Sequence, residues 1–546
     1  MDMRRTIMAI AASFVILLSW QQLSVYMGWT PDPALQPAPQ QQAQPAQDGQ
    51  AGGQAGGQVS EGQPQTQASA PVAPLPAFQP APGRDVVVET PLYKAVFYSG
   101  GGILREFSLK TYRMGLEPDS PVLQMISPEA AAKAPMGIIL DGAPSWSGTS
   151  WSLEGGDLNL KAGETGTLTF VGEVNGVRLA RVLAFDASKF SIKETVKLQS
   201  EQPRSLRLAF TMSTGKLSQG GDYDLTRVAY LEDDSFKSAE SEKDLSAGLT
   251  PSGNFSWAGI MSNYFLAAVT PTDTNTTLKI KLENGAYRVA VEKTGITVGP
   301  AQTASLDASY YIGPKEQGIL NAEPGDLGKA INYGFFSIVA RPLIAMLHFF
   351  YGFAGNWGVA IILLTLVIKI ILWPLSYKSY KSMEQMKKLQ PMMAKLKEKH
   401  GDDKETMNRE MMQLYKTYKV NPASGCLPIL VQIPVFIGLY QGLLGSIQLR
   451  HASFIPHIPF TDYVWLADLS VKDPYYITPI VMGLTMLLQQ KLTPAAGDPM
   501  QQKIMMIMPV VFTFFFLNFP SGLVVYWLAN NVISIAQQWW QLRRVK

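Results

Sequence analysis

The sequence predicts a membrane α-helical bundle of six transmembrane helices joined to an all-β sandwich domain. Of its 546 residues, 47% are hydrophobic and only 16% are charged, against roughly 25% charged residues in an average soluble domain. Long apolar runs gather at the N-terminus and after residue 326, while residues 84–325 carry short alternating segments typical of strands. The net charge of +3 is too small to indicate a nucleic-acid-binding protein, so no sequence-specific nucleic-acid binding is expected.

Residues 1–28 are expected to form an N-terminal transmembrane anchor. Basic residues near the start precede an apolar run from Ile7 to Trp20, and a weaker apolar stretch continues to Gly28. The same order describes a cleaved signal peptide, but no small-x-small cleavage site follows Trp20. Together the two stretches reach the roughly 20 residues that span a bilayer. We therefore expect an uncleaved anchor whose amino end lies in the cytoplasm.

Residues 29–83 read as a disordered linker. The segment consists almost wholly of Pro, Gln, Ala and Gly and contains no lysine or arginine. Such a composition cannot bury enough apolar surface to offset the entropy of ordering. We expect a flexible, partly polyproline-like tether between the anchor and the next domain.

Residues 84–325 are expected to form the β-sandwich on the outer, periplasmic side of the membrane. Short alternating or β-branched runs, such as Asp85–Glu89 and Val177–Phe185, are separated by Gly, Asp, Asn and Pro turns. This spacing is typical of an antiparallel sandwich. Because the amino end of the anchor is expected inside, the domain that follows it lies outside.

An enzymatic interpretation of this domain rests on three short motifs. Ser213-Thr-Gly-Lys216, Ser252-Gly-Asn254 and Lys293-Thr-Gly295 follow the order found in penicillin-binding transpeptidases. That chemistry needs Ser213 at the start of a helix with Lys216 one turn later. The residues after Lys216 are instead poor helix formers in a β-patterned domain, so we expect no catalytic residues and no enzyme.

Six apolar runs follow residue 326, and the charges of their loops decide which runs cross the membrane. The loop from Leu375 to Cys426 is the most basic, with eleven Lys/Arg against six Asp/Glu. Placing it inside allows only one crossing before it, so residues 326–355, interrupted by Arg341-Pro342, are expected to lie along the outer interface as an amphipathic helix. Residues 356–546 then form the remaining five crossings, and both termini lie in the cytoplasm. The runs are 333–353, 357–373, 427–449, 475–490, 504–519 and 523–540.

Residues 375–426 are expected to form an antiparallel helical hairpin in the cytoplasm. Apolar residues recur there at helical spacing, Asp402 and Asp403 can cap the second helix, and Asn421-Pro422 ends it. Its methionines either join the two helices or, because methionine is soft and adaptable, contact varied apolar clients or a ribosomal surface. Both roles are compatible. The methionines in question are Met383, Met386, Met393, Met407 and Met411.

Lys369 lies twelve residues into the run 357–373, where a cation near the membrane centre costs about 2.5–3.5 kcal/mol. One explanation is snorkelling, because the cytoplasmic end of the run is only about five residues, roughly 7.5 Å, away. The other is function, because Thr365 lies on the same helical face. Single polar residues are ordinary contacts between helices, whereas several helices that each offer one indicate a hydrated cavity or a solute path. Further polar residues in the runs are Gln432, Thr485, Gln489, Thr513, Tyr526, Asn530 and Ser534.

A series of ordered motifs runs through the C-terminal half. It comprises Asn356-Trp-Gly, Lys369 before Trp373-Pro-Leu, Lys419-Val-Asn-Pro, Gly425-Cys-Leu-Pro, Gln432-Ile-Pro, Asp473-Pro-Tyr-Tyr-Ile, Asp498-Pro-Met-Gln-Gln-Lys-Ile-Met and Phe519-Pro-Ser-Gly-Leu. This series resembles the YidC/Oxa/Alb family of membrane protein insertases. The anchor, linker and large outer domain resemble the Gram-negative form of that family, so the resemblance covers nearly the whole chain.

The resemblance implies five core helices around a groove that opens to the cytoplasm and the lipid and is closed on the outer side. Lys369 matches the family's groove cation, which is usually arginine; the charge is kept, but the planar fork of donors is lost. Thr365, Gln432 and Tyr526 match other groove positions, and Trp527 matches an aromatic position that contacts substrate and is more familiar as tyrosine. The short basic tail departs from relatives with a long basic extension. The outer domain would resemble a sugar mutarotase without a catalytic site.

The same resemblance implies a function. We expect the chain to insert, fold and help assemble inner-membrane proteins without nucleotide hydrolysis, alone or with the Sec translocon. The implied partners are nascent membrane-protein chains, the ribosome, SecYEG and SecDF, and the lipid bilayer. No cofactor or metal is expected, since the four histidines lack ligand spacing, there is one cysteine, and no Walker-type loop occurs. From the residues alone a small-anion or solute transporter is the alternative, although the tall hairpin and the lack of an evident inverted repeat argue against it.

Overall fold

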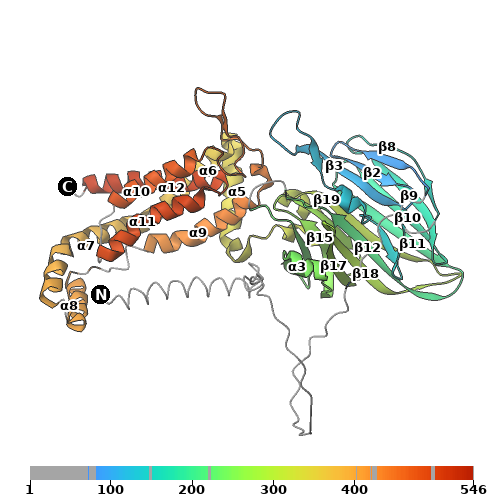
Figure 1. Cartoon of the computed structure of the whole chain (residues 1–546), viewed down its shortest axis with the longest axis horizontal. Helices are drawn as coiled ribbons and strands as arrows, with labels where there is room; N and C mark the ends of the chain where they lie inside the picture. Colours follow the sequence, from blue (N-terminus) through green and yellow to red (C-terminus); the bar gives the residue numbers. More distant parts are fainter. Residues whose placement is uncertain are drawn as a thin grey trace, which may run out of the picture.

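The structure is a computed structural model that describes residues 72, 82–146, 150–218, 223–400, 403–418, 420, 427–492 and 499–544. Figure 1 shows a β-rich domain beside a bundle of helices, with the two parts meeting near α5. The predicted anchor, residues 1–28, lies outside the described residues, as does the predicted linker apart from residues 72, 82 and 83. The predicted division into a β-rich part and a helical C-terminal part is confirmed.

The β-rich domain contains a 14-stranded sheet and a smaller five-stranded sheet in the order β4-β3-β2-β1-β8. Neighbouring strands pair antiparallel, except that β1 and β8 are parallel. The bounds are β1 Asp85–Glu89, β2 Tyr93–Tyr98, β3 Ile103–Arg113, β4 Val122–Gln124, β5 Ile138–Leu140, β6 Ala143–Pro144, β7 Trp151–Glu154, β8 Leu158–Asn159, β9 Thr165–Val174, β10 Val177–Asp186, β11 Ser191–Ser200, β12 Arg204–Thr214, β13 Arg227–Glu232, β14 Ser235–Ala239, β15 Ser252–Met261, β16 Phe265–Pro271, β17 Asn275–Glu283, β18 Ala286–Val298 and β19 Ala304–Pro314, with short helices α2 Pro128–Ala131, α3 Glu242–Ala247 and α4 Gln317–Asn321. The expected likeness to sugar mutarotases stays a prediction.

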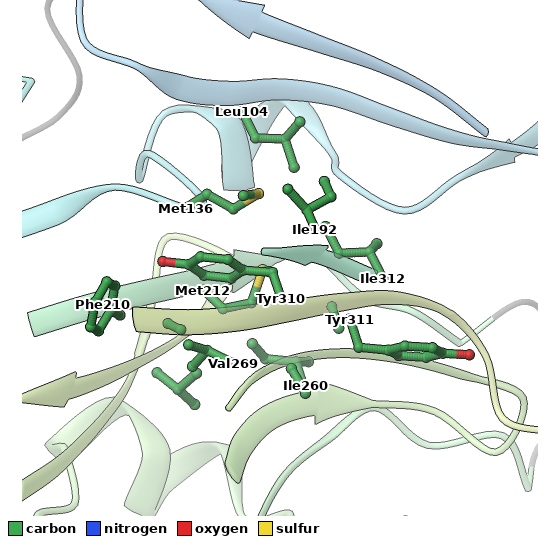
Figure 2. Close-up of a cluster of buried hydrophobic side chains, with 14 of the residues drawn as sticks. Leu104, Met136, Ile192, Phe210, Met212, Ile260, Val269, Tyr310, Tyr311 and Ile312 are labelled. Carbon is green, nitrogen blue, oxygen red and sulfur yellow. The ribbon is translucent and has the colours of Figure 1, made fainter. Parts of the chain in front are cut away.

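The alternating pattern of the strands fixes which residues enter the core. Along β10 every second residue is buried, because successive side chains of a strand point to opposite faces. The same register turns Arg181 inward, where its side chain is fully buried. Figure 2 shows the result in the apolar core, where Leu104, Met136, Ile192 and Tyr310, from segments far apart in the sequence, converge on one cluster.

A buried ion pair accompanies this apolar core. The Arg181 Nε donates to the Glu194 carboxylate at 2.6 Å, and its Nη1 donates to the Gly102 carbonyl at 2.7 Å. A third donor reaches the Met136 carbonyl at 2.5 Å. Because both charged side chains are fully buried, each depends on the other to offset the loss of water.

The helical part forms a second core. Leu364, Leu439, Met482 and Val524, from four different helices, are completely buried in it. In Figure 1, α10 and α12 run side by side, and α6, α9 and α11 complete the bundle. The helices are α5 Ser337–Ala354, α6 Trp357–Ile371, α7 Trp373–His400, α8 Lys404–Thr417, α9 Leu427–Leu444, α10 Ile477–Leu492, α11 Pro499–Phe516 and α12 Ser521–Arg544; the 3-10 turns are η2 Pro324–Ala330, η3 Gly334–Phe336 and η5 Ile447–Leu449, and a small hairpin joins β20 Ile455–His457 to β21 Val464–Leu466.

Length and composition identify few complete membrane spans in the described part. Residues Gly334–Ala354 form one helical stretch that is long and apolar enough to cross a bilayer. The pair α6 and α7, which bends by 63° at its break, passes the same test as a unit, and shorter apolar stretches lie at Leu430–Leu444 and Met506–Phe516. Six crossings are therefore not shown and stay a prediction.

Helix α5 is the segment predicted to lie along the outer interface. It stays helical through Pro342 and lies at the end of the bundle that faces the β-rich domain. One side packs on α6 and α9, whereas Ile338, Phe349 and Phe353 are 87%, 73% and 86% exposed. An apolar outer side suits lipid whether the helix lies flat or crosses, so its orientation stays a prediction.

Candidate functional site

The Asn356-Trp-Gly motif begins α6 and fixes its N-terminal end. The Asn356 side chain accepts a hydrogen bond from the Val359 amide at 3.1 Å, which caps the helix, and donates to the Phe454 carbonyl at 3.1 Å. Trp357 stacks on Tyr351 of α5 with ring centroids 4.0 Å apart. The motif thus joins α5, α6 and the segment before β20.

Gly358 is required where α6 lies directly against the Phe454 ring. A Cβ atom at Gly358 would lie 2.1 Å from the Phe454 ring. We expect Gly358→Ala to destabilise the helical part by about 1–3 kcal/mol, because overpacking forces a side chain out of its rotamer. Thermal unfolding of the detergent-solubilised protein measures this loss.

The matched control for this prediction is Gly352→Ala on α5, where an added Cβ would meet nothing within 4 Å. That change is expected to be neutral or slightly stabilising, because alanine favours a helix over glycine. The double variant Gly358→Ala/Phe454→Ala is expected to regain stability relative to Gly358→Ala alone. Equal behaviour of the two single glycine variants would contradict the steric explanation.

Lys369 lies inside the bundle rather than at its surface. It is 4% exposed, and its Nζ donates to the Ser534 hydroxyl of α12 at 2.6 Å. Ser534 in turn donates to the Asn530 carbonyl at 2.7 Å. Within the described ranges no carboxylate forms an ion pair with Lys369. A buried cation satisfied only by a neutral hydroxyl retains a strong capacity to attract an anion.

The other predicted groove residues occupy separate positions. Thr365 is 1% exposed and donates its hydroxyl to the Ile361 carbonyl within α6 at 2.7 Å, and Tyr526 is buried in α12. Gln432 is half-buried on α9, and among the described residues no hydrogen bond joins it to Lys369. The structure therefore does not gather all the predicted residues around one point.

Trp527 belongs to an aromatic cluster that the sequence analysis missed. Its ring lies 4.8 Å from Phe436 of α9, and 5.2 Å and 6.1 Å from Phe516 and Phe512 of α11. Phe512 and Phe516 are four residues apart, and this spacing in the sequence predicts that both lie on the same face of a helix. Trp527 is half-buried among these rings, so an aromatic wall joins three helices.

The C-terminal half of α12 carries a polar face inside the bundle. Asn531, Ser534, Gln537 and Gln538 are each at most 5% exposed. The Gln537 side-chain oxygen has no hydrogen-bond partner among the described residues. An orphaned buried carbonyl of this kind costs about 1–3 kcal/mol unless water satisfies it. The face therefore favours a hydrated interior next to Lys369.

The segment between α9 and α10 closes the end of the bundle that faces the β-rich domain. Leu449, Leu466 and Leu469 are each 1% exposed and belong to the bundle core. The Asp473-Pro-Tyr-Tyr-Ile motif anchors the start of α10, since the Asp473 carboxylate accepts from the Thr478 amide and hydroxyl at 2.7 and 2.8 Å. The segment is also tied to the start of α12, because the Gly522 amide donates to the Leu469 carbonyl at 3.0 Å.

The β-rich domain packs against this outer segment. Arg450 donates to the Arg113 carbonyl at 2.7 Å, and its guanidinium lies 5.6 Å from the Phe265 ring centroid. Tyr223 meets Phe519 edge-on, with ring centroids 5.1 Å apart. These contacts join both domains at the closed end of the bundle.

Helices α7 and α8 pack as a pair through their apolar faces. Asp403 caps α8 by accepting from the Glu405 and Thr406 amides at 3.1 Å each, whereas Asp402, Asn421 and Pro422 lie outside the described residues. Of the predicted contact methionines, Met386 and Met407 are buried and the others, Met383, Met393 and Met411, are half-buried.

Two further methionines face outward on the same pair of helices. Met392 and Met412 are 41% and 55% exposed and were not among the predicted contact residues. Met392 and Met412 are adjacent in sequence to the predicted Met393 and Met411. The sequence does not separate the exposed methionines from the others; the packing of α7 on α8 does. The exposed pair is available to a partner.

The transpeptidase interpretation does not fit the geometry. Ser213 lies in strand β12 rather than at the start of a helix, is completely buried, and donates to the Ala130 carbonyl at 3.3 Å. Lys216 is exposed and pairs with Glu242 at 3.5 Å. Ser213 is therefore neither accessible nor activated. Of the described residues, no three His, Cys, Asp or Glu side chains lie close enough to hold a metal ion.

Comparison with known proteins agrees along the whole chain. Residues 85–346 match the family model of the YidC periplasmic domain, and residues 349–546 match that of the 60Kd inner membrane protein. Membrane protein insertase YidC of Nitratidesulfovibrio vulgaris strain DP4 is 56% identical over 549 residues, and that of strain Miyazaki F is 57% identical over 547; both alignments cover 100% of each chain. A solved active YidC insertase shares 19% identity over 84% of this chain and 93% of that chain, with a TM-score of 0.36. The two family models and the full-length relatives show that this chain belongs to the YidC family of membrane protein insertases.

Proposed function

We propose that this chain inserts nascent membrane proteins into the bilayer along a polar groove between α6 and α12. The observation that carries the proposal is Lys369, a buried cation that contacts the Ser534 hydroxyl and pairs with no carboxylate in the described part of the chain. The aromatic wall at Trp527 and the outer closure by Leu449 and Leu466 supply the remaining features of a half-channel.

The free-energy requirement explains why such a groove is useful. About twenty leucine-like residues at roughly −0.5 kcal/mol each favour insertion by about 10 kcal/mol, so no nucleotide hydrolysis is needed. The obstacle is the polar flank of the client, because each acidic residue costs about 2.5–3.5 kcal/mol at the membrane centre. During passage, Lys369 and the polar face of α12 provide a charge and hydrogen bonds to the polar flank of the client. These interactions lower the free-energy barrier to insertion.

The finer features belong to the same proposal. The chain makes six crossings in the inner membrane, with both termini in the cytoplasm and the β-rich domain in the periplasm. The pair α7 and α8 receives the client from the ribosome, and the exposed Met392 and Met412 suit apolar segments of varied sequence. The chain acts alone or beside SecYEG and SecDF, and it acts as a chaperone for assembly rather than as an enzyme.

Photocrosslinking to a ribosome-stalled single-span client tests this function. A small diazirine amino acid is introduced at Thr365, Gln432 or Trp527, and matched controls carry it on the outer faces of the same helices. Crosslinks from the groove positions at far higher yield than from the controls are expected. The controls are Leu366, Ile433 and Val532, which are 42%, 43% and 49% exposed.

The transporter alternative predicts a different outcome. Absence of client crosslinks at all three groove positions, together with flux of a small anion through vesicles containing the purified protein, would contradict insertion. That result would assign the buried Lys369 to an anion path instead.

A further inference from the structure

The β20–β21 hairpin is attached to the closed end of the bundle through its base. At its base the Phe454 amide donates to the Leu466 carbonyl at 2.8 Å, and Leu466 is 1% exposed in the bundle core. At its tip the Ile458 amide donates to the Tyr463 carbonyl at 2.9 Å. The hairpin projects sideways from the end of the bundle that carries α5 (Figure 1). The base of the hairpin is therefore part of the bundle core, and its tip is closed by a hydrogen bond of its own.

The tip presents an aromatic residue that neither packing nor backbone preference explains. Phe460 is fully exposed, at 107% of the reference value, and its φ is +67°. A bulky residue rarely adopts this left-handed conformation, which costs of order 1–3 kcal/mol. Glycine or asparagine would form the same turn with less strain. Exposure and strain together indicate that the phenyl ring contacts something outside this chain.

Neighbouring residues extend the exposed aromatic surface toward the start of α10. Tyr463 is 65% exposed and meets Tyr475 edge-on at 6.3 Å, and Tyr475 and Tyr476 are 43% and 38% exposed. Tyr476 also has a left-handed φ of +56°. We define Phe460, Tyr463, Tyr475 and Tyr476 as the aromatic rim.

We propose that the aromatic rim inserts into the headgroup region of the outer leaflet and anchors the closed end of the bundle to lipid. Tyrosine and other aromatic side chains prefer this depth, where an apolar ring and a polar edge are both satisfied. The rim lies where α10 begins, which is the depth at which a spanning helix meets the headgroups. Residues 451–471 contain no lysine or arginine, and the exposed Asp462 lies beside Phe460, so the hairpin offers no cationic surface to an acidic protein partner.

The consequence concerns the closure of the groove. The same segment carries Leu466 and Leu469, which cover the outer end of the bundle. A lipid contact at the tip of the hairpin holds this cover while a client moves through the groove below it. The inference rests on membrane embedding of the bundle under the proposed function and adds an anchoring surface to it.

The test is depth-dependent quenching of an environment-sensitive fluorophore on the full-length protein in phosphatidylethanolamine/phosphatidylglycerol vesicles. The label is attached at Phe460→Cys in a Cys426→Ser background. The lipid control is Phe514→Cys on α11, which is 72% exposed, and the water control is Ser152→Cys on the exposed side of β7. We expect strong quenching at 460 by a nitroxide near the headgroups, a blue-shifted emission, and protection from iodide.

Three outcomes would overturn the proposal. Quenching at 460 by iodide, as at 152, would place the tip in water. Protection from both iodide and nitroxide lipid would mean that a second copy of the chain covers it. Failure of nitroxide lipid to quench the label at 514 as well would also remove the membrane embedding on which the proposed function depends, whereas failure at 460 alone leaves that function intact.

A second variant separates lipid contact from folding of the turn. Phe460→Asn removes the ring but tolerates a positive φ, so the hairpin is expected to keep its shape. With the label at Tyr463→Cys, this replacement is expected to reduce nitroxide quenching and increase quenching by iodide. Unchanged quenching would contradict a role of Phe460 in holding the rim in lipid.

Discussion

Replacing Lys369 by alanine is expected to slow insertion of clients with acidic translocated tails by roughly tenfold to hundredfold. The Lys369 ammonium is buried and donates to the Ser534 hydroxyl at 2.6 Å. It can therefore bind a client carboxylate without first breaking an ion pair. A hydrogen bond to a charged group contributes about 1.5–3 kcal/mol, which corresponds to that range of rates. Insertion into vesicles of clients that differ only in the number of acidic residues in the tail measures the effect.

Two variants make this prediction specific. Lys369→Arg keeps the charge and is expected to retain most of the activity toward acidic tails. Lys193→Ala removes an exposed lysine on β11, far from the groove, and is expected to leave insertion unchanged. If Lys369→Ala slowed neutral and acidic tails equally, the charge of Lys369 would not be the reason for the loss.

Replacing Glu194 by glutamine is expected to destabilise the β-rich domain by about 3–5 kcal/mol, because it leaves the Arg181 charge buried without its counter-charge. Both side chains are completely buried, and Arg181 already donates to the Glu194 carboxylate at 2.6 Å. Urea unfolding of the full-length protein in detergent, followed by tryptophan fluorescence, measures the loss. The fold of the helical part is expected to be unaffected.

The controls for Glu194 separate a fully buried pair from a partly exposed one. Lys279→Ala breaks the partly exposed pair with Glu292 and is expected to cost at most about 1 kcal/mol. The double variant Arg181→Met/Glu194→Leu is expected to recover most of the stability lost by Glu194→Gln, since two apolar side chains need no counter-charge. If the double variant were less stable than Glu194→Gln, the hydrogen bonds from Arg181 to the Gly102 and Met136 carbonyls would contribute more stability than the ion pair with Glu194.

Local patterns predicted the elements because each has a short-range cause. The strand Asp85–Glu89 appears at the bounds of its alternating run, and the run Val177–Phe185 matches β10 to within one residue. Asp403 begins α8 through the capping bonds expected of its position. The buried charge at Lys369 was also visible, since a cation within an apolar run stands out in any sequence. The family itself followed from ordered motifs at Asn356, Asp473 and Phe519, and full-length relatives confirm it.

Contacts between distant segments could not be predicted in the same way. The alternation along β10 places Arg181 on the core face, but nothing local to β10 shows that its partner there is Glu194, because the pairing of β10 with β11 decides it. Nothing local to α12 selects Ser534, rather than Asn530, as the partner of Lys369. The choice depends on the rotation of α12 against α6.

The sequence by itself determined the division into β-rich and helical parts, the family, and the presence of a cation in an apolar helix. Periodicity, capping residues and the cost of burying charge act within a few residues, so they can be read directly from the chain. Only the tertiary structure decided that Lys369 meets Ser534, that Trp527 joins Phe436 and Phe516, and that Phe460 is left exposed at the tip of a strained turn. These depend on how helices and hairpins pack, and packing is set by the summed fit of many side chains rather than by any one segment.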